Sequence, residues 1–376
     1  MTRIEIRGTH EPATIAQLER CMGVGSAARG VLCADGHLGY AQPVGGVIAY
    51  ESHVSISGVG FDIGCGNLAV RTDAAFADVA GGLPRILRDV PRHVGFGLGR
   101  VNGEAVDHAI FDSPLWKAAG VDNLKRMARD QLGTVGSGNH YVDLFRDEEE
   151  RVWIGVHFGS RGLGHRCATT FLKKAGGREG IDVEPALVEQ DSELGRRYLA
   201  AMELAGAYAA AGREWVVERV LRILGARAEE SVHNHHNYAW RERHGDRDYW
   251  VVRKGATPAF PGQRGFVGGS MGDDAVILEG VDGPASQALL RSTVHGAGRI
   301  ASRREAKRRF TRQAMEDWLR GREIALVGGD LDESPMAYRR LDEVLEHHAD
   351  TVRVLHRLRP FAVFMAGAGE FDPYRD

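Results

Sequence analysis

Apolar side chains recur along this chain with two different spacings. Residues 185–225 are rich in Ala, Leu, Glu and Arg and place apolar positions three and four residues apart, which predicts a long helix. A shorter helix is expected at residues 12–22. Residues 153–157 and 249–258 are apolar runs rich in Val and aromatic residues, which favour buried strands. The prolines within residues 74–135 predict a mixture of helical and irregular structure.

The same spacings predict elements in the second half of the chain. The long helix is expected to continue as far as residues 231–238, and the basic run at residues 303–309 is expected to form a helix of its own. Residues 332–338 are expected to cap a helix that runs to about residue 356, and residues 361–365 to form a closing strand. No internal repeat is visible in the sequence.

Length bears on the number of domains. A chain of 376 residues would usually form two or three domains. The candidate site residues run from residue 62 to residue 295, however, with no linker between them. We therefore expect one interwoven α+β domain over residues 1–376, and the hydrophobic fraction of 43% is sufficient for its core.

Charge and cysteine content narrow the class of protein. The formal net charge of −3 gives no overall attraction to nucleic acid, so any RNA contact requires a local basic patch. The cysteines show no paired spacing, the chain does not start like a signal peptide, and no apolar run is long enough to cross a bilayer. These features predict a cytoplasmic protein with reduced thiols and no membrane contact.

A glycine-rich turn at residues 58–67 carries the first candidate chemistry. It places Asp62 and Cys65 three residues apart, and a thiolate can bridge two divalent metal ions. Alone, such a pair is more often a buried turn with a structural cysteine. His140, His157 and His236 supply matching ligands further along the chain, so we predict a metal site.

The polar loop at residues 32–47 leads directly into this turn. Its Gly, Asp and His residues lie between apolar segments, a composition more typical of a site than of a connecting loop. Asp35 and His37 are therefore candidates for groups that support the metal ligands or act as a general base.

Small-residue loops and basic side chains indicate a phosphate-bearing substrate. The small residues at 158–165 allow backbone amides to approach an anion, and the loop at 268–272 could hold a nucleotide through its backbone. His295 lies in another small-residue turn, apart from the ligand clusters, which suits a nucleophile attacking phosphorus. The residues alone predict metal-dependent phosphoryl or nucleotidyl transfer, and a hydrolase fits as well. The candidate phosphate-binding side chains are Arg161, Arg253, Lys254 and Arg299.

Seven sequence blocks, taken in order, resemble those of the RtcB-type RNA ligases. The resemblance covers residues 30–367, nearly the whole chain. Any single block is weak evidence, whereas the ordered set is highly specific. The blocks are Gly-Phe-Asp-Ile-Gly-Cys-Gly at residues 60–66, Gly-Ser-Gly-Asn-His at 136–140, His-Phe-Gly-Ser-Arg-Gly at 157–162, His-Asn-Tyr at 236–238, Arg-Lys-Gly-Ala-Thr at 253–257, Gly-Ser-Met-Gly at 269–272 and His-Gly-Ala-Gly-Arg at 295–299.

This resemblance implies a mechanism and a set of cofactors. It implies two Mn(II) ions bridged by Cys65, and an attack by His295 on the α-phosphate of GTP that leaves GMP on the histidine. The GMP then passes to an RNA 3′-phosphate, generated where necessary by opening a 2′,3′-cyclic phosphate, and an RNA 5′-hydroxyl displaces it to seal the strand. The implied metal ligands are Asp62, Cys65, His140, His157 and His236.

The resemblance also implies a fold, a process and further contacts. The fold is an α+β core whose sheets, flanked by helices, surround a central metal cleft. The process is RNA repair or tRNA splicing, with an archease-type activator as a candidate partner. Positions that match nucleotide contacts are Asn139, Asp143, Ser270, Ala297, Gly298 and Tyr338, and those assigned to RNA or phosphate are Asp35, Arg161, Arg253, Lys254 and Arg299.

The sequence departs from the family pattern at four positions. Ala366 stands where a lysine that touches guanine is usual, and Asp143 where a glutamate is usual. Val252 replaces a histidine, and Gly268 replaces a proline. The ligands and the nucleophile are kept, so metal binding and guanylylation are expected. Base preference is less secure, because a charge-assisted hydrogen bond to guanine is missing.

Two other classes of function are open on the sequence. A dinuclear phosphodiesterase or nuclease would use the same metals with an activated water and no covalent nucleotide. A non-catalytic protein that binds RNA ends would keep the pocket without turnover. His295 discriminates between the two enzymes, because a ligase loses all activity on His295→Ala whereas a metal hydrolase keeps a substantial rate.

Overall fold

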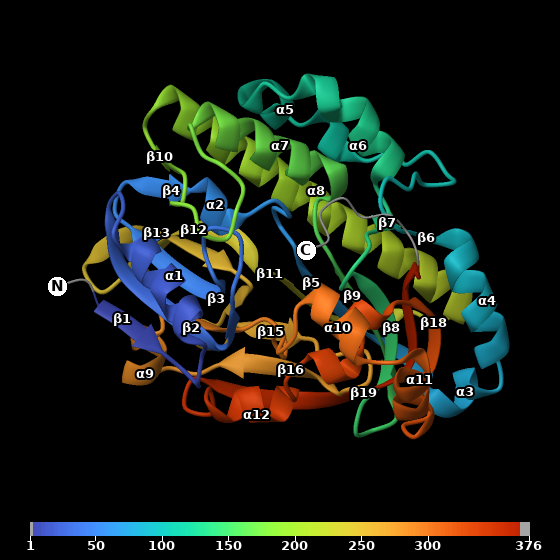
Figure 1. Ribbon diagram of the computed structural model, residues 1–376. Coiled ribbons are helices and arrows are strands. Elements are labelled where there is room, and N and C mark those ends of the chain that lie inside the picture. Colours follow the sequence, from blue (N-terminus) through green and yellow to red (C-terminus); the bar gives the residue numbers. More distant parts are fainter. Residues whose placement is uncertain (1–2, 369–376) are drawn as a thin grey trace.

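Two large β-sheets form the framework of the protein, and a computed structural model describes residues 3–368 of it (Figure 1). The five-stranded sheet has the order β1-β2-β3-β13-β12. Its strands are β1 (Arg3–Ile6), β2 (Ala27–His37), β3 (Val44–Tyr50), β13 (Arg247–Lys254) and β12 (Asn237–His244).

The eight-stranded sheet follows the order β11-β5-β9-β8-β19-β16-β15, with β18 paired in parallel to β19. Its two end strands, β11 and β15, approach each other. The Asn234 side chain on β11 accepts a hydrogen bond from the Phe266 amide on β15 at 2.9 Å. The strands are β11 (Ala228–His235), β5 (Gly66–Ala75), β9 (Arg151–Phe158), β8 (Tyr141–Arg146), β19 (Val352–Gly367), β16 (Ala275–Gly280), β15 (Arg264–Val267) and β18 (Ala325–Gly329).

The shorter strands pair two by two. They are β4 (His53–Ser55) with β10 (Leu187–Glu189), β6 (Gly95–Phe96) with β7 (Thr134–Val135), and β14 (Ala256–Pro258) with β17 (Ser292–Val294). The β14–β17 pair matters for the site, because it places the segment after Val294 beside the turn that follows β13.

Helices gather on two sides of these sheets, with α5, α6, α7 and α8 on one side and α9, α11 and α12 on the other (Figure 1). None of the helices within residues 3–368 combines the length and the apolar character needed to span a membrane. The helices are α1 (Pro12–Met22), α2 (Ile56–Val59), α3 (Phe76–Ala80), α4 (Leu83–His93), α5 (Leu115–Ala119), α6 (Lys125–Gln131), α7 (Arg161–Lys174), α8 (Glu193–Leu224), α9 (Pro284–Ala288), α10 (Arg303–Arg309), α11 (Arg312–Arg320) and α12 (Leu341–Glu346), with short 3-10 turns at Ala109–Asp112, Asp122–Leu124, Leu331–Glu333 and Pro335–Ala337.

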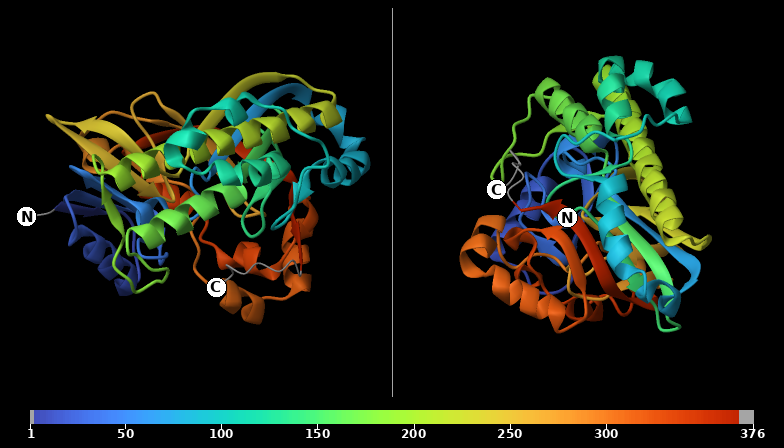
Figure 2. Two further views of the ribbon diagram at one scale, coloured as in Figure 1. Left: turned by 90° about the horizontal axis from the view of Figure 1, so that it is seen from above. Right: turned by 90° about the vertical axis from the view of Figure 1, so that its right-hand side faces the viewer.

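Helix α8 is the long helix that the apolar spacing predicts, and it extends along the eight-stranded sheet (Figure 2). It begins where the Ser192 side chain accepts a hydrogen bond from the Gly195 amide. Val216 and Val220 pack in one buried cluster with Leu68 of β5 and Val156 of β9. Burial of such side chains stabilises the fold by about 1.5–3 kcal/mol each.

The prediction that this helix continues to residues 231–238 is wrong. The helix ends at Leu224, because Gly225 takes the left-handed conformation (φ 72°) that terminates helices. Residues after it form β11, in which Val232 and Asn234 are buried while their neighbours are more exposed. His236 therefore follows a strand and does not lie on a helix.

The predicted helix from residues 332–338 to about residue 356 is also wrong. The segment contains two 3-10 turns and the short helix α12, and β19 starts at Val352. Val352, Val354 and Leu358 lie within a strand pattern that pairs with β16. The expected closing strand at residues 361–365 is confirmed as part of β19.

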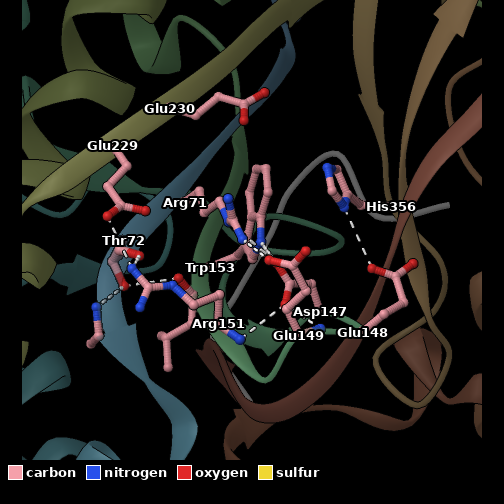
Figure 3. A network of polar contacts seen from close by, with 12 residues as sticks. Arg71, Thr72, Asp147, Glu148, Glu149, Arg151, Trp153, Glu229, Glu230 and His356 are labelled. Atoms are coloured by element: carbon pink, nitrogen blue, oxygen red, sulfur yellow. Dashed lines mark hydrogen bonds and ion pairs between the residues drawn. The ribbon is translucent and has the colours of Figure 1, made fainter.

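A buried carboxylate organises the turn that joins β8 to β9 (Figure 3). The Asp147 side chain accepts hydrogen bonds from Trp153 Nε1 at 2.8 Å and from the Glu149 and Arg151 amides at 2.9 Å. Arg71 of β5 lies 3.4 Å away, so three adjacent strands are tied together at this point. Burial opposes ionisation, but these hydrogen bonds lower the pKa of Asp147.

We expect Asp147→Ala to lower the free energy of unfolding by about 3–5 kcal/mol, because three donors and the Arg71 charge lose their acceptor. Denaturation in urea measures the change. The carboxylate's contribution is present above the pKa of an unfolded aspartate, about 3.9, and is lost as the pH falls through the lower folded pKa. Glu149→Ala is the control in the same turn and should cost under about 1 kcal/mol, since that carboxylate is 70% exposed. A loss that small for Asp147→Ala would contradict this account.

Candidate metal centre and active site

Four neighbouring strands bring the candidate ligands to one edge of the eight-stranded sheet. Cys65 precedes β5, His157 is near the end of β9, His140 precedes β8 and His236 follows β11. The strands lie side by side in the order β11-β5-β9-β8 and alternate in direction, so the start of β5 and the end of β9 fall at the same edge. The antiparallel pairing thus assembles residues that lie up to 171 positions apart, from Cys65 to His236.

The thiol of Cys65 is at the centre of this cluster. Its Sγ lies 3.7 Å from His140 Nε2 and 3.6 Å from His157 Nε2. One ligand atom from each of these three residues lies within 4.8 Å of the others, a separation suited to a shared metal ion. Asp62 joins the group, because its Oδ2 lies 3.0 Å from His140 Nε2.

His236 lies beside the group formed by Cys65, His140 and His157 but is not one of the three residues whose ligand atoms lie within 4.8 Å of one another. Its ring lies 5.0 Å from that of His157 and 4.8 Å from that of His295, and its amide donates to the Cys65 carbonyl at 2.8 Å. Among the described residues, Nδ1 of His236 and Nδ1 of His140 are buried and have no hydrogen-bond partner. Such orphaned nitrogens are costly in an apolar environment unless a ligand completes them.

Glycine makes the close approaches in the metal turn feasible. Gly64 has φ 70°, and a Cβ there would lie 2.8 Å from the Gly206 backbone of α8. A Cβ on Gly159 would lie 2.1 Å from a carboxylate oxygen of Asp62. Both glycines therefore place the Asp62–Cys65 turn tightly against α8 and the end of β9.

Burial sets the protonation of the ligands. Burial, together with the charges of neighbouring histidines, lowers the pKa of His157 and His236 well below the usual value, so both are neutral and offer a lone pair. Burial would raise the pKa of Asp62, but the hydrogen bond and charge of His140 lower it to about 2. Burial and Asp62 raise the pKa of Cys65, a barrier that a bound cation removes because coordinated thiols ionise. The donors therefore fit a borderline divalent metal ion.

Asn67 supports this cluster and carries no role in the sequence-based prediction. Its Oδ1 lies 2.6 Å from His157 Nδ1, and its amide donates to the Phe266 carbonyl at 2.8 Å. The accepting oxygen fixes the proton on Nδ1 and directs Nε2 toward Cys65. One feature of the sequence could have indicated this role. Side chains alternate between the two faces of a strand, so residue 67 lies on the same face as residue 65.

We expect Asn67→Leu to weaken metal binding about 10–100-fold, because His157 loses the group that fixes its tautomer. Competition with a chromophoric chelator measures the dissociation constant. Asn67→Asp is the matched variant: it keeps an accepting oxygen and should retain more of the affinity. Equal affinities for Asn67→Leu and the wild type would show that Asn67 only fills space.

The second feature of the site is a pair formed by Asp35 and His295. Asp35 lies near the end of β2 and is fully buried, and its Oδ2 lies 2.6 Å from His295 Nδ1 and 3.0 Å from the His295 amide. Burial opposes ionisation of Asp35, but the His295 contacts lower its pKa. An ionised Asp35 accepts a hydrogen bond from Nδ1–H of His295. In this tautomer the lone pair of the ring lies on Nε2. Asp35, assigned above to phosphate binding, thus contacts the candidate nucleophile.

Four of the candidate nucleotide residues, Ser270, Ala297, Gly298 and Tyr338, lie in or beside the His295 turn, whereas Asn139 and Asp143 belong to the segment around β8. A backbone bridge joins Gly268 to Gly296 and another joins Arg299 to Tyr338, which brings the Ser270 loop and Tyr338 beside the His295 turn. Ala297 is buried, and Gly298 has φ 75° in that turn. Asn139 is exposed next to the ligand His140. Asp143 lies on β8, where burial raises its pKa, and its Oδ1 has no partner among the described residues.

The predicted phosphate-binding cations differ in their surroundings. Arg253 is fully buried, with Nη1 2.6 Å from a Glu242 oxygen and further bonds to Ser292 and the Leu290 carbonyl. Lys254 donates to backbone carbonyls and burial lowers its pKa to about 8.

The other two predicted cations lie nearer the surface. Arg299 pairs with Glu333 at 3.2 Å and donates to Tyr338 Oη at 2.8 Å. Arg161 is half-buried and donates to the Gly97 carbonyl at 3.0 Å. The Arg253 guanidinium is thus committed to protein partners, whereas Arg161 and Arg299 keep some exposure.

Fold and site together define a mixed α/β protein with a Cys/His/Asp metal-type cluster beside a carboxylate-oriented histidine. A family model described as "tRNA-splicing ligase RtcB" matches residues 15–121 and 116–366 of the chain. The chain therefore belongs to the RtcB family of RNA ligases.

Individual relatives cover nearly the same span. The RNA-splicing ligase RtcB of Escherichia coli K12 is 32% identical over 362 residues, which is 86% of this chain and 87% of the relative. The tRNA-splicing ligase RtcB of Thermococcus kodakarensis is 31% identical over 418 residues (89% and 86%). The RNA-splicing ligase RtcB of Mycobacterium bovis is 32% identical over 409 residues (87% and 94%).

Proposed function

We propose that this protein is an RNA ligase that joins RNA ends bearing a 2′,3′-cyclic phosphate or a 3′-phosphate to ends bearing a 5′-hydroxyl, with GMP carried on His295. The observation that carries the proposal is the Asp35–His295 contact of 2.6 Å beside the Cys65 cluster. The hydrogen bond engages Nδ1, so Nε2 is the ring nitrogen available as a nucleophile next to a group of metal-type ligands. The names of the relatives support RNA joining, and the guanylate step rests on the family resemblance.

Where the RNA ends in a 2′,3′-cyclic phosphate, water first bonds to phosphorus and the bond to O2′ breaks, which gives a 3′-phosphate. The joining itself then takes three displacements. Nε2 of His295 bonds to the α-phosphorus of GTP and pyrophosphate leaves. An RNA 3′-phosphate oxygen then bonds to that phosphorus and the N–P bond breaks, which regenerates the imidazole. Finally the RNA 5′-hydroxyl bonds to the 3′-phosphorus and GMP leaves. When bound, divalent cations would polarise the phosphoryl oxygens and neutralise developing charge.

The chain's own residues orient these steps. Asp35 keeps the proton on His295 Nδ1 and stabilises the positive charge that develops on the ring as Nε2 bonds to phosphorus. The proposed holders of the two Mn(II) ions are Asp62, Cys65, His140, His157 and His236. The proposed nucleotide contacts are Asn139, Asp143, Ser270, Ala297, Gly298 and Tyr338, and Arg161 and Arg299 are the proposed phosphate contacts.

We further propose that the chain acts as one catalytic domain. Asp35 comes from the five-stranded sheet, whereas the candidate metal ligands come from the edge of the eight-stranded sheet. A reaction centre built from both sheets requires both to be present. RNA repair or tRNA splicing is the proposed process, and an archease-type protein is the proposed activator.

A joining assay with the purified full chain tests the function. The reaction contains Mn(II), GTP and two RNAs, one labelled and ending in a 2′,3′-cyclic phosphate or 3′-phosphate, the other starting with a 5′-hydroxyl. We expect a product of the summed length. Cleaved or dephosphorylated RNA without a joined product would favour the hydrolase. RNA that binds the protein, seen as a mobility shift in a native gel, but is recovered unchanged would favour the end-binding protein. Either result, obtained both in the absence and in the presence of the archease-type activator, would overturn the proposal.

A further inference from the structure

The guanidinium of Arg213 is fully buried beneath the candidate metal cluster, although arginine is rarely buried without a charged partner. Its contacts all go to neutral groups. Nη1 donates to the carbonyl oxygens of Gly64, at 3.0 Å, and of Phe158. Nε lies 2.9 Å from His233 Nε2, and Nη2 lies 2.9 Å from His235 Nδ1. A guanidinium only donates, so both imidazoles are the acceptors.

Three of the four partners of Arg213 are the chain neighbours of candidate ligands. Gly64 precedes Cys65, Phe158 follows His157, and His235 precedes His236. Gly64 lies two residues before β5, and Phe158 and His235 are the last residues of β9 and β11, so the three segments meet at the same sheet edge. One rigid side chain from α8 thus bonds to three separate segments of the cluster.

The cost of burying this charge indicates what the side chain does. An aliphatic residue would fill the same position on α8 without desolvating a charge. Burial lowers the pKa of Arg213 to about 10, and the nearby Asp62 carboxylate offsets this effect only in part. The planar fork of arginine fixes the direction of each hydrogen bond, which the flexible ammonium of lysine does not.

We propose that Arg213 is a positioning residue that holds Cys65, His157 and His236 in their metal-binding arrangement before a metal ion binds. The inference rests on the proposed function insofar as these residues are the ligands. Arg213 itself contacts neither metal nor substrate. It acts through the backbone at Gly64 and Phe158 and through the His235 ring.

The test compares Arg213→Met, Arg213→Lys and the wild type in the full chain. Cobalt(II) is titrated into the protein without nucleotide or RNA, and the thiolate-to-cobalt absorption band reports ligation by Cys65. We expect Arg213→Met to raise the dissociation constant at least about tenfold and to weaken the band, because second-layer contacts are worth about 10–100-fold in metal affinity. Arg213→Lys should lie between the two, since it keeps the charge but loses the fork.

Ser192→Ala is the control for a general loss of stability. It removes the N-cap of α8, at a cost of about 1 kcal/mol, and leaves the cluster untouched. The control should bind cobalt as the wild type does. Wild-type affinity and band in a folded Arg213→Met protein would overturn the proposal, and if that variant does not fold, wild-type behaviour of Arg213→Lys would do so. Failure of the wild type to join RNA, with the cobalt results as expected, would affect the proposed function alone.

Discussion

Replacement of His295 by alanine is expected to abolish RNA joining, with a loss of at least about 10⁴-fold in rate. The proposed intermediate is a covalent bond to Nε2, and within residues 3–368 the structure places no second imidazole against Asp35 Oδ2, since His37 contacts the Asp35 carbonyl instead. Quantification of joined RNA over time, under single-turnover conditions, measures the loss.

A control variant and a metal-binding measurement show whether the loss of joining is specific to His295. His356→Ala, which removes a histidine that contacts Glu148 away from the site, should join RNA at the wild-type rate. The His295→Ala protein should still bind metal, because His295 is not one of the proposed ligands and touches the ring of His236 from outside the Cys65, His140 and His157 group. A variant that keeps more than about a hundredth of the wild-type joining rate would contradict a covalent mechanism and favour direct attack of the RNA 5′-hydroxyl on a 2′,3′-cyclic phosphate, whose ring-opening needs no activating nucleotide.

Replacement of Cys65 by serine is expected to give the second largest effect. A hydroxyl is a much weaker ligand than a thiolate, and Sγ is the atom that both His140 and His157 face. We expect the metal dissociation constant to rise at least about 100-fold, and joining to disappear at metal concentrations that saturate the wild type. The metal-to-protein ratio after dialysis measures the change.

Cys167→Ala is the matched control for this prediction. Cys167 is equally buried but lies in α7 among apolar side chains, so its removal leaves a small cavity and no missing ligand. That variant should keep its full metal content at a modest cost in stability. Unchanged metal content in the Cys65→Ser protein would remove Cys65 from the cluster and with it the proposed thiolate bridge.

Metal binding could be predicted from the sequence because it depends on the types of side chain present. A carboxylate, a thiol and several histidines in glycine turns indicate metal binding wherever they lie along the chain. What the sequence does not contain is the pairing of β11 with β5 and of β9 with β8. That long-range pairing brings His140 and His157 to Cys65, and it is fixed by side-chain packing between strands.

The wrong predictions have local causes. The helical pattern before Gly225 masked a strand in which burial alternates, so His236 was expected on a helix. The phosphate contact of Arg253, expected because its strand ends in a basic turn, stays a prediction. The structure pairs Arg253 with Glu242 of the adjacent strand β12, and such a cross-strand neighbour cannot be identified from the segment of Arg253 alone.

The supporting residues Asn67 and Arg213 illustrate the same limit. Neither belongs to a motif of metal-ligand residue types, and each acts through a partner more than fifty positions away along the chain. Asn67 on β5 contacts His157, its partner on the adjacent strand β9. Arg213 lies on α8 and contacts the segments beside the candidate ligands. Groups of this kind emerge only when burial and hydrogen bonding are considered together.

Labelling with GTP carrying radioactive α-phosphate tests the central claim most directly. The wild type and His295→Ala are incubated with Mn(II) and the nucleotide, without RNA, then denatured and treated with alkali or acid. The account predicts label on the wild type alone, stable in alkali and lost in acid as for a histidine phosphoramidate. A parallel reaction with ATP reports base preference, since Ala366 offers no side-chain donor to guanine. Absence of label on a wild-type preparation that joins RNA in the separate joining assay, or equal label on His295→Ala, would contradict the account.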